Sequence, residues 1–171
     1  MIIFTRPPYP WMFYPYLILS VTDSTSERYL RRGIEAVIID SGVYTVFKKL
    51  GLREYPGGPI AWMLKIVSLY NVAKRYVSSV YAVVPDYPVD YKGNPVPNNV
   101  EKTIRNIELA LDSFKDVDWI IPVQGRPCSI QSVAKTIELL EQLGLLRGDY
   151  IAIAPNCNSR SEEYMRRLFL V

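Results

Sequence analysis

Short apolar runs alternate with longer amphipathic segments along most of this chain. Each run is about five residues long and rich in valine and isoleucine, and polar or turn residues bound it. Such runs are typical of strands that are buried on both faces of a parallel sheet. The predicted strands are Tyr16–Val21, Ala36–Asp40, Val80–Val84, Trp119–Val123 and Tyr150–Ala154.

The intervening segments repeat their apolar residues at helical spacing. Ser24 and Glu27 match a capping box, and Ser129 is placed to cap a helix that Gly144 ends. Asparagines at 98 and 99 are the candidate caps of the helix before that one. The predicted helices are 24–32, 59–76, 98–114, 129–143 and 161–168.

The longest predicted helix begins at Pro59, because proline fits the first turn of a helix. Its apolar face is expected at Ile60, Leu64, Val67 and Val72. One such face is what a helix needs to pack against a sheet.

Strand and helix alternate throughout, and no linker or low-complexity tract divides the chain. This alternation predicts an α/β fold, a single domain over residues 1–171, in which right-handed βα units build a parallel sheet. Five strands are clear, Met1–Thr5 is a candidate sixth, and a proline-rich loop is expected over Val89–Asn98.

The absence of histidine narrows the chemistry. The 171 residues contain none, which excludes a Ser-His-Asp triad, a Cys-His pair and an HExxH zinc helix. Acid–base chemistry near neutral pH therefore falls to carboxylates, lysine, tyrosine or cysteine. Cys128 and Cys157 are too few for a structural zinc site or a disulfide framework, so no metal or other cofactor is expected. The two cysteines can form one disulfide bridge or remain two free thiols.

The net charge is +3, which permits a phosphate-bearing partner without requiring one. The apolar amino terminus carries Arg6 and several prolines, and no run approaches the ~20 apolar residues of a membrane span. The expectation is a cytoplasmic protein with no membrane partner.

Polar residues and glycine follow the predicted strands directly. Active sites of parallel α/β folds lie beyond the carboxyl ends of the strands, so two carboxylates and an amide are expected to converge on one rim. The alternative is that each carboxylate only caps a following turn or helix. The strand ends read Asp40-Ser41-Gly42, Pro85-Asp86-Tyr87-Pro88, Pro122-Val123-Gln124-Gly125 and Ala154-Pro155-Asn156.

A convergent set of two aspartates, a glutamine and a glycine has a definite chemical use. The carboxylates accept hydrogen bonds from the N–H groups of a guanine-like edge, and the amide and a backbone N–H donate to its carbonyl. Such a site discriminates strongly, because a wrong edge leaves buried polar groups unpaired. A carboxylate can also attack a sugar carbon or transfer a proton.

At these residues the chain resembles the tRNA-guanine transglycosylase superfamily, the queuine and archaeosine tRNA-ribosyltransferases. Val37–Tyr44 resembles the family's DSGGF segment, Val84–Pro88 its second Asp element, and Ile121–Gly125 its VQG element. Tyr150–Asn156 resembles the strand that carries its Gly-Leu-Ala segment. The elements keep the family order over roughly Tyr16–Leu168, and the chain is also similar to shorter phage-type relatives that act in making deazapurine-modified DNA.

The resemblance implies a (β/α)8 barrel of the TIM type, complete or incomplete, whose mouth binds a purine. It implies that Asp40 serves in catalysis near the base and that Asp86 reads the purine N1 and amino group. Tyr44 either stacks near the base or packs inside the barrel. The expected substrate contacts are Ser41, Gly42, Tyr44, Gln124, Gly125 and Asn156.

Arg126 and Arg160 lie just past strand ends and are the candidate phosphate contacts, although either can equally be a solvated surface residue. The chain departs from the family at Val43 and Thr45, where the family has glycine and glutamine, and at 154–156, where Ala-Pro-Asn stands for Gly-Leu-Ala. The ligands of the family's zinc ion are absent.

The family's nucleophilic aspartate ends a later strand that has no counterpart in this sequence. The expected barrel therefore lacks about two βα units, and either a second chain supplies them or Asp40 or Asp86 is the nucleophile. Three functions follow: exchange of guanine for a 7-deazapurine in tRNA or DNA, non-catalytic binding of a purine or nucleic acid, and carboxylate-dependent N-glycosidase activity.

Overall fold

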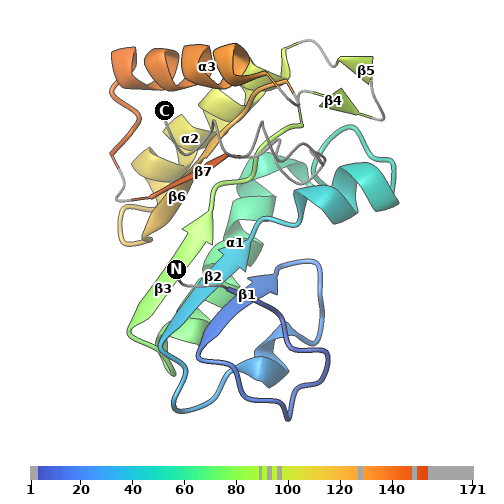
Figure 1. Ribbon diagram of the computed structural model, residues 1–171, viewed down its shortest axis with the longest axis vertical. Coiled ribbons are helices and arrows are strands. Elements are labelled where there is room, and N and C mark those ends of the chain that lie inside the picture. Colours follow the sequence, from blue (N-terminus) through green and yellow to red (C-terminus); the bar gives the residue numbers. More distant parts are fainter. Residues whose placement is uncertain are drawn as a thin grey trace.

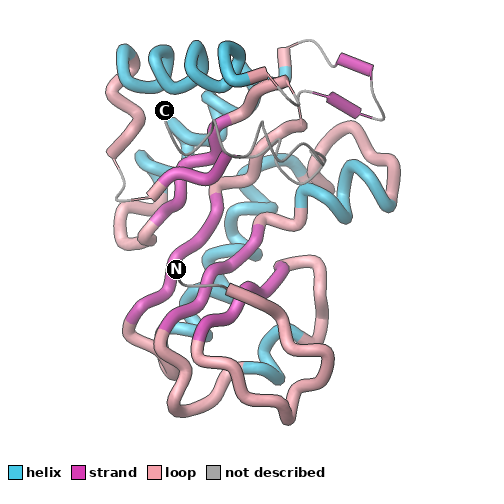
Figure 2. The backbone as a smooth tube through the Cα atoms, in the orientation of Figure 1, coloured by secondary structure: helices cyan, strands magenta, loops and turns pink. Residues whose placement is uncertain are grey.

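The chain adopts an α/β fold built on a five-stranded, all-parallel sheet (Figure 1). A computed structural model describes residues 4–88, 90–91, 94–95, 98–126, 129–147 and 150–153. Figure 2 shows strands joined by helices and loops, as the alternating sequence pattern predicts. The prediction of an α/β fold with parallel strands is therefore confirmed.

The order of these strands in the sheet is β1-β2-β3-β6-β7, which is their order along the chain. Each strand therefore lies beside the one before it, and the described sheet contains no reversal of strand order of the kind that marks a doubly wound fold. All neighbouring pairs are parallel. The strands are β1 (Tyr16–Ser20), β2 (Ala36–Asp40), β3 (Ser79–Val83), β6 (Trp119–Val123) and β7 (Ile151–Ile153).

Burial along these strands differs from the prediction that both faces are covered. β6 is buried at all five positions, whereas β1 and β3 alternate between buried and half-buried residues. The fully buried residues of the sheet include Leu19, Val37 and Val80, and they belong to the main hydrophobic core. Asp40, the last residue of β2, lies at a half-buried position.

The candidate strand at the amino terminus contributes a single β-bridge to β1 among its described residues. Thr5 pairs in parallel with Leu17 of β1: its N–H donates to Tyr16 O at 3.2 Å, and its carbonyl accepts from Ile18 N–H at 3.2 Å. Met1–Ile3 lies outside the described residues.

Helix α1 (Gly58–Lys74) packs against β2 and β3, behind the strands in Figure 1. The expected apolar face is wrong at Ile60 and Leu64, since each of these side chains is 54% exposed, whereas Val67 and Val72 pack against the core as expected. Apolar residues occur on nearly every side of this helix, so their spacing does not select the face that packs. The face against the sheet carries Trp62, Met63, Ile66, Leu69, Tyr70 and Ala73.

The helix predicted over 24–32 is also wrong, because only the 3-10 turn η1 (Ser26–Tyr29) forms there. No capping box is present. The Asp23 carboxylate instead accepts hydrogen bonds from the Thr25 N–H at 2.9 Å and the Thr25 hydroxyl at 2.8 Å. Leu30 then adopts extended geometry with ψ 125°, which ends the helical turn.

Helix α3 (Ile130–Gln142) packs against β6. The predicted cap is confirmed: Ser129 Oγ accepts a hydrogen bond from Ser132 N–H at 3.3 Å. Gly144 follows the helix with φ 65°, the left-handed geometry expected of a C-terminal stop.

Helix α2 (Asn99–Ser113) packs against β6 and α1. Asn98 precedes it in left-handed geometry with φ 62°, and no side-chain cap forms, so the predicted capping role is wrong. The segment predicted as a loop contains a short antiparallel pair, β4 (Asp90–Tyr91) and β5 (Asn94–Pro95). Within the described ranges no helix has the length and apolar character needed to cross a bilayer.

Candidate functional site

Three neighbouring strand ends bring their polar side chains together. Asp86 follows β3 and is 4% exposed. Its Oδ1 accepts a hydrogen bond from Ser41 Oγ at 3.4 Å, at the end of β2, and its Oδ2 accepts from the Gln124 amide, at the end of β6. Ser41 and Gln124 are 1% and 3% exposed. These polar side chains from sequence-distant segments therefore form one buried chain of hydrogen bonds.

Asp40 is the last residue of β2 and lies beside these hydrogen-bonded side chains. Its Oδ2 accepts a hydrogen bond from Gly42 N–H at 3.0 Å, and Ser20 of the adjacent strand β1 donates to it as well. Ser20 and Asp40 are partners in the register of the sheet. Asp40 thus caps the turn that follows β2, as one of the two interpretations of the sequence predicted. It also lies near Asp86.

Burial sets the charge of both carboxyl groups. It raises the pKa of Asp86 to about 7, and the nearby Asp40 carboxylate raises it as well, against the hydrogen bonds from the backbone, Ser41 and Gln124. Burial also raises the pKa of Asp40, and the Gly42 and Ser20 hydrogen bonds oppose that rise. Asp86 therefore changes charge near neutral pH, a property expected of functional carboxyl groups.

Gly42 allows the turn after β2 to approach β1. Its φ is 75°, and a Cβ at this position would lie 2.5 Å from Thr22 Cγ2. The Gly42 N–H is the donor that holds Asp40. The glycine expected here as a substrate contact therefore has a structural reason of its own.

Replacing Gly42 by alanine is expected to lower the free energy of unfolding by about 3 kcal/mol, because backbone strain and overpacking add. Gly58→Ala is the matched control: its φ is 82°, and a Cβ there meets nothing within 4 Å, so it carries the strain alone. Thr22→Ser removes the clashing methyl group and should recover about half of the loss in the double variant. Equal losses for Gly42→Ala and Gly58→Ala in urea unfolding would show that the contact with Thr22 is unimportant.

Gly125 is buried behind Gln124, against the start of α3. A Cβ there would lie 2.7 Å from Val133 Cγ2 and 3.1 Å from Val133 N, so close helix packing also requires this glycine. Arg126, the next residue, has an exposed side chain at the same strand end, and its N–H donates to Ser132 Oγ at 2.9 Å. Its place fits a surface contact with phosphate.

Tyr44 begins the π-helical turn η2 (Tyr44–Lys49), directly after the Asp40 loop. Its side chain is 54% exposed, which disfavours the alternative of a tyrosine packed inside a barrel. The Lys48 and Lys49 ammonium groups lie 5.4 and 5.9 Å from its ring centre. π-Helical turns are rare and occur frequently at functional sites.

Several predicted positions fall outside the described residues. They are Asn156, Arg160, the two cysteines, Ala154-Pro155 and the helix predicted over 161–168.

The residues that hold the loop after β3, which carries Asp86, were not predicted from the sequence. Four consecutive carbonyl groups, from Pro85 to Pro88, each accept a hydrogen bond from a side chain. Asn106 donates to Pro85 O at 2.7 Å, Asn99 donates to Pro88 O, and Thr103 donates to Tyr87 O at 3.5 Å. The donor to Asp86 O is Tyr55, at 2.6 Å, and Thr103 Oγ1 also accepts from Tyr87 N–H at 2.9 Å.

One signal for this arrangement was present in the sequence. Asn99, Thr103 and Asn106 recur at helical spacing on the same face of α2 as Ala110, and all four are buried. Polar side chains on the packed face of a helix need partners, because an unpaired buried polar group is costly. Tyr55 lies in the irregular segment before α1, where no periodicity could mark it.

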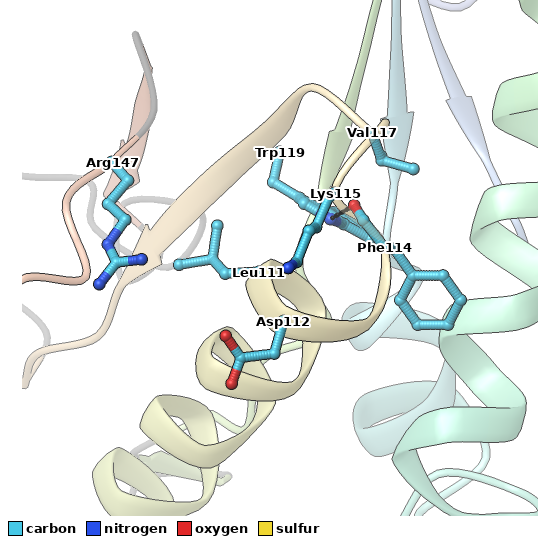
Figure 3. A pocket seen from close by; sticks show the side chains of 7 residues that line it. All are labelled: Leu111, Asp112, Phe114, Lys115, Val117, Trp119 and Arg147. Carbon is cyan, nitrogen blue, oxygen red and sulfur yellow. Dashed lines mark hydrogen bonds between the residues drawn. The ribbon is translucent and has the colours of Figure 1, made fainter.

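A pocket lies at the other end of the sheet (Figure 3). It has a volume of about 380 Å³ and lies beside Trp119, the first residue of β6, whereas Gln124 follows the last. Figure 3 shows the Arg147 side chain on one side of it and Asp112 and Lys115 on the other. A strand of this length spans roughly 17 Å, so the pocket is separate from the Asp86 site.

Among the described residues, no three acidic or cysteine side chains gather in a way that could hold a metal ion. Comparison with protein-family models, curated protein sequences and solved structures found no match for this chain. The geometry of the strand-end site therefore carries the functional argument.

Proposed function

We propose that this chain binds a purine base of the guanine or 7-deazaguanine type and exchanges that base in tRNA or DNA. Asp86 and Gln124 recognise the base, and Asp40 carries the chemical step. The observation that supports this most directly is the buried hydrogen-bonded chain of Ser41, Asp86 and Gln124 at neighbouring strand ends.

The recognition step follows from which groups donate. An ionised Asp86 accepts hydrogen bonds only, which suits the N1–H and 2-amino donors of guanine. The Gln124 amide has two N–H bonds, and one of them already points at Asp86. The second can donate to the O6 carbonyl of the same base. Adenine presents an acceptor at N1 and a donor at position 6, so it would leave both side chains mispaired.

The chemical step falls to Asp40 because Asp86 is buried and already engaged by two side chains. In the proposed reaction, the Asp40 carboxylate attacks the sugar C1′, the C1′–N9 bond breaks, and the departing purine takes up a proton from water at its ring nitrogen. The incoming deazapurine then loses its N9 proton to water as it attacks C1′, and the C1′–O bond to Asp40 breaks to release the carboxylate. A carboxylate nucleophile of this kind divides a difficult substitution into two easier ones.

A barrel of the TIM type, complete or completed by a second chain, is the architecture we propose for the whole site. The sequential order of the parallel strands supports it, since barrels are wound in that way. The exposed Tyr44 and Arg126 at the same edge support a nucleic acid as the source of the base, because exposed aromatic and cationic side chains suit bases and phosphates.

A labelled-guanine exchange assay on tRNA and on duplex DNA tests the proposal. Incorporation of label into either nucleic acid is the expected result. Release of free base without an acceptor base would instead identify an N-glycosidase. Guanine binding with no exchange and no release would identify a binding module, and absence of guanine binding would reject the proposed function.

The affinity for guanine is expected to rise with pH through about 7, the pKa of Asp86 in the free protein. Only the ionised carboxylate accepts both donors, so the affinity should fall roughly 100-fold between pH 8 and pH 5. Equilibrium dialysis with labelled guanine measures this, and Asp86→Asn is the control that should lose the pH dependence. A flat profile in the unaltered protein would contradict the assignment of Asp86.

A further inference from the structure

Two buried aromatic side chains donate hydrogen bonds to the two loops that carry the candidate carboxylates. The Tyr55 hydroxyl donates to Asp86 O at 2.6 Å, and Trp62 Nε1 donates to Ser41 O at 2.8 Å. Tyr55 is 2% and Trp62 6% exposed. Their rings pack on each other with centres 5.3 Å apart and an interplanar angle of 35°.

The pair therefore connects the end of β2 to the end of β3 through backbone atoms. The side chains of those loops meet at the contact between Ser41 Oγ and Asp86 Oδ1, 3.4 Å apart. Tyr55 and Trp62 donate these hydrogen bonds to carbonyl oxygens and not to a carboxylate. The Tyr55 hydroxyl also interacts with the Ser41 side chain, so Tyr55 acts on Asp86 through the backbone of its loop and through Ser41.

We infer that Tyr55 and Trp62 form an aromatic bracket that sets the spacing between Ser41 and Asp86 and keeps the Asp86 carboxyl group buried. Both are positioning residues. Their effect on a purine ligand rests on the proposed function, whereas their effect on the ionisation of Asp86 does not.

The hydroxyl group is the part of Tyr55 that packing alone does not explain. The ring lies in an aromatic cluster, 5.1 Å from Phe47 and 5.4 Å from Tyr87 between centres. A phenylalanine would keep those ring contacts. It would lose the donor to Asp86 O, one of the four side-chain donors to the loop after β3, and the Asp86 carboxyl group would gain access to water.

Tyr55→Phe is the central test, with the titration of the Asp86 carboxyl carbon followed by NMR. The midpoint of about 7 should fall by roughly one pH unit as the carboxyl group gains water. Guanine should bind about tenfold more weakly above pH 8, where both proteins are ionised and only the altered geometry counts. Trp62→Phe removes the other donor and should lower the same midpoint.

Tyr70→Phe is the matched control. Tyr70 is also 2% exposed, and its hydroxyl donates to Asp118 Oδ2 at 2.9 Å, at the opposite end of the sheet. It should change neither the Asp86 titration nor guanine binding, even where it lowers the melting temperature. A merely structural role for Tyr55 predicts this same pattern for Tyr55→Phe.

An unchanged Asp86 midpoint in both bracket variants would overturn the inference, whatever guanine does. Loss of the fold in both variants would overturn it too, since the pair would then serve stability and not position. A lowered midpoint in a protein that never binds guanine would uphold the bracket and reject the proposed function.

Discussion

Replacing Asp86 by asparagine is expected to stabilise the fold at pH 8. The folded-state pKa of about 7 lies above the ordinary value near 3.9, so the folded protein holds the proton more tightly than the unfolded chain. The contribution of Asp86 to stability is then greatest below pH 4 and falls as the pH rises towards 7. The ionised carboxylate costs on the order of 4 kcal/mol above pH 7, and a neutral amide of the same shape avoids that cost.

Urea unfolding of both proteins at pH 4.5 and pH 8 measures this effect. The variant and the unaltered protein should differ little at pH 4.5, where Asp86 is protonated in the folded state. Asp118→Asn gives a control of opposite sign, because its salt bridge with Lys74, at 3.0 Å, lowers the pKa of Asp118. The stability gained by Asp86→Asn over the unaltered protein should be larger at pH 8 than at pH 4.5. An equal gain at both pH values would contradict a buried charge at Asp86.

The same substitution should abolish recognition of guanine. An asparagine amide group turns a donor towards the N1–H and 2-amino donors of the base, and the loss of a bidentate pair is worth about 1–3 kcal/mol before the repulsion is counted. A loss of affinity of about 100-fold or more is therefore expected at pH 8. Tight guanine binding by Asp86→Asn would remove Asp86 from the site.

These two effects have one cause and opposite signs. The fold is less stable with a charged carboxylate at this position, while the proposed recognition of guanine requires that charge. Natural proteins break local folding rules at functional sites and compensate elsewhere. Here the compensation includes the side-chain donors of α2 and Tyr55, which hold the loop that carries the charge.

The strands and their polar ends were predictable because both depend on local sequence. An apolar run followed directly by Asp40 or by Gln124 marks a strand and its carboxyl end, and parallel strands then place these ends at one edge. The hydrogen bond between Asp86 and Gln124 could be expected in outline for this reason.

The residues that hold the loops of the site were not predictable, because their positions depend on which faces of the helices pack against the sheet. Helix α1 is apolar on most sides, so only its contacts with the sheet reveal that Trp62 faces Ser41 while Ile60 faces outward. In the turn after β1, Asp23 and Ser24 are both possible capping residues, and it is the Asp23 carboxylate that accepts the Thr25 N–H. Tyr55 acts on a loop 31 residues away, and no local pattern encodes such a contact.

Replacing Asp40 by asparagine is expected to lower base exchange about 1,000-fold or more while guanine still binds. An amide cannot displace the purine, so the exchange step loses its nucleophile. Guanine binding at pH 7 should rise by up to about twofold, because the Asp40 charge raises the pKa of Asp86 and its removal leaves more of Asp86 ionised. Single-turnover exchange and equilibrium dialysis on one preparation separate these two effects.

This opposite response distinguishes a chemical role for Asp40 from a structural one. A collapse of the turn after β2 would weaken binding and exchange together, and Gly42→Ala provides that reference because it disturbs the same turn without removing the carboxylate. Exchange at the unaltered rate in Asp40→Asn would assign the nucleophile to another group.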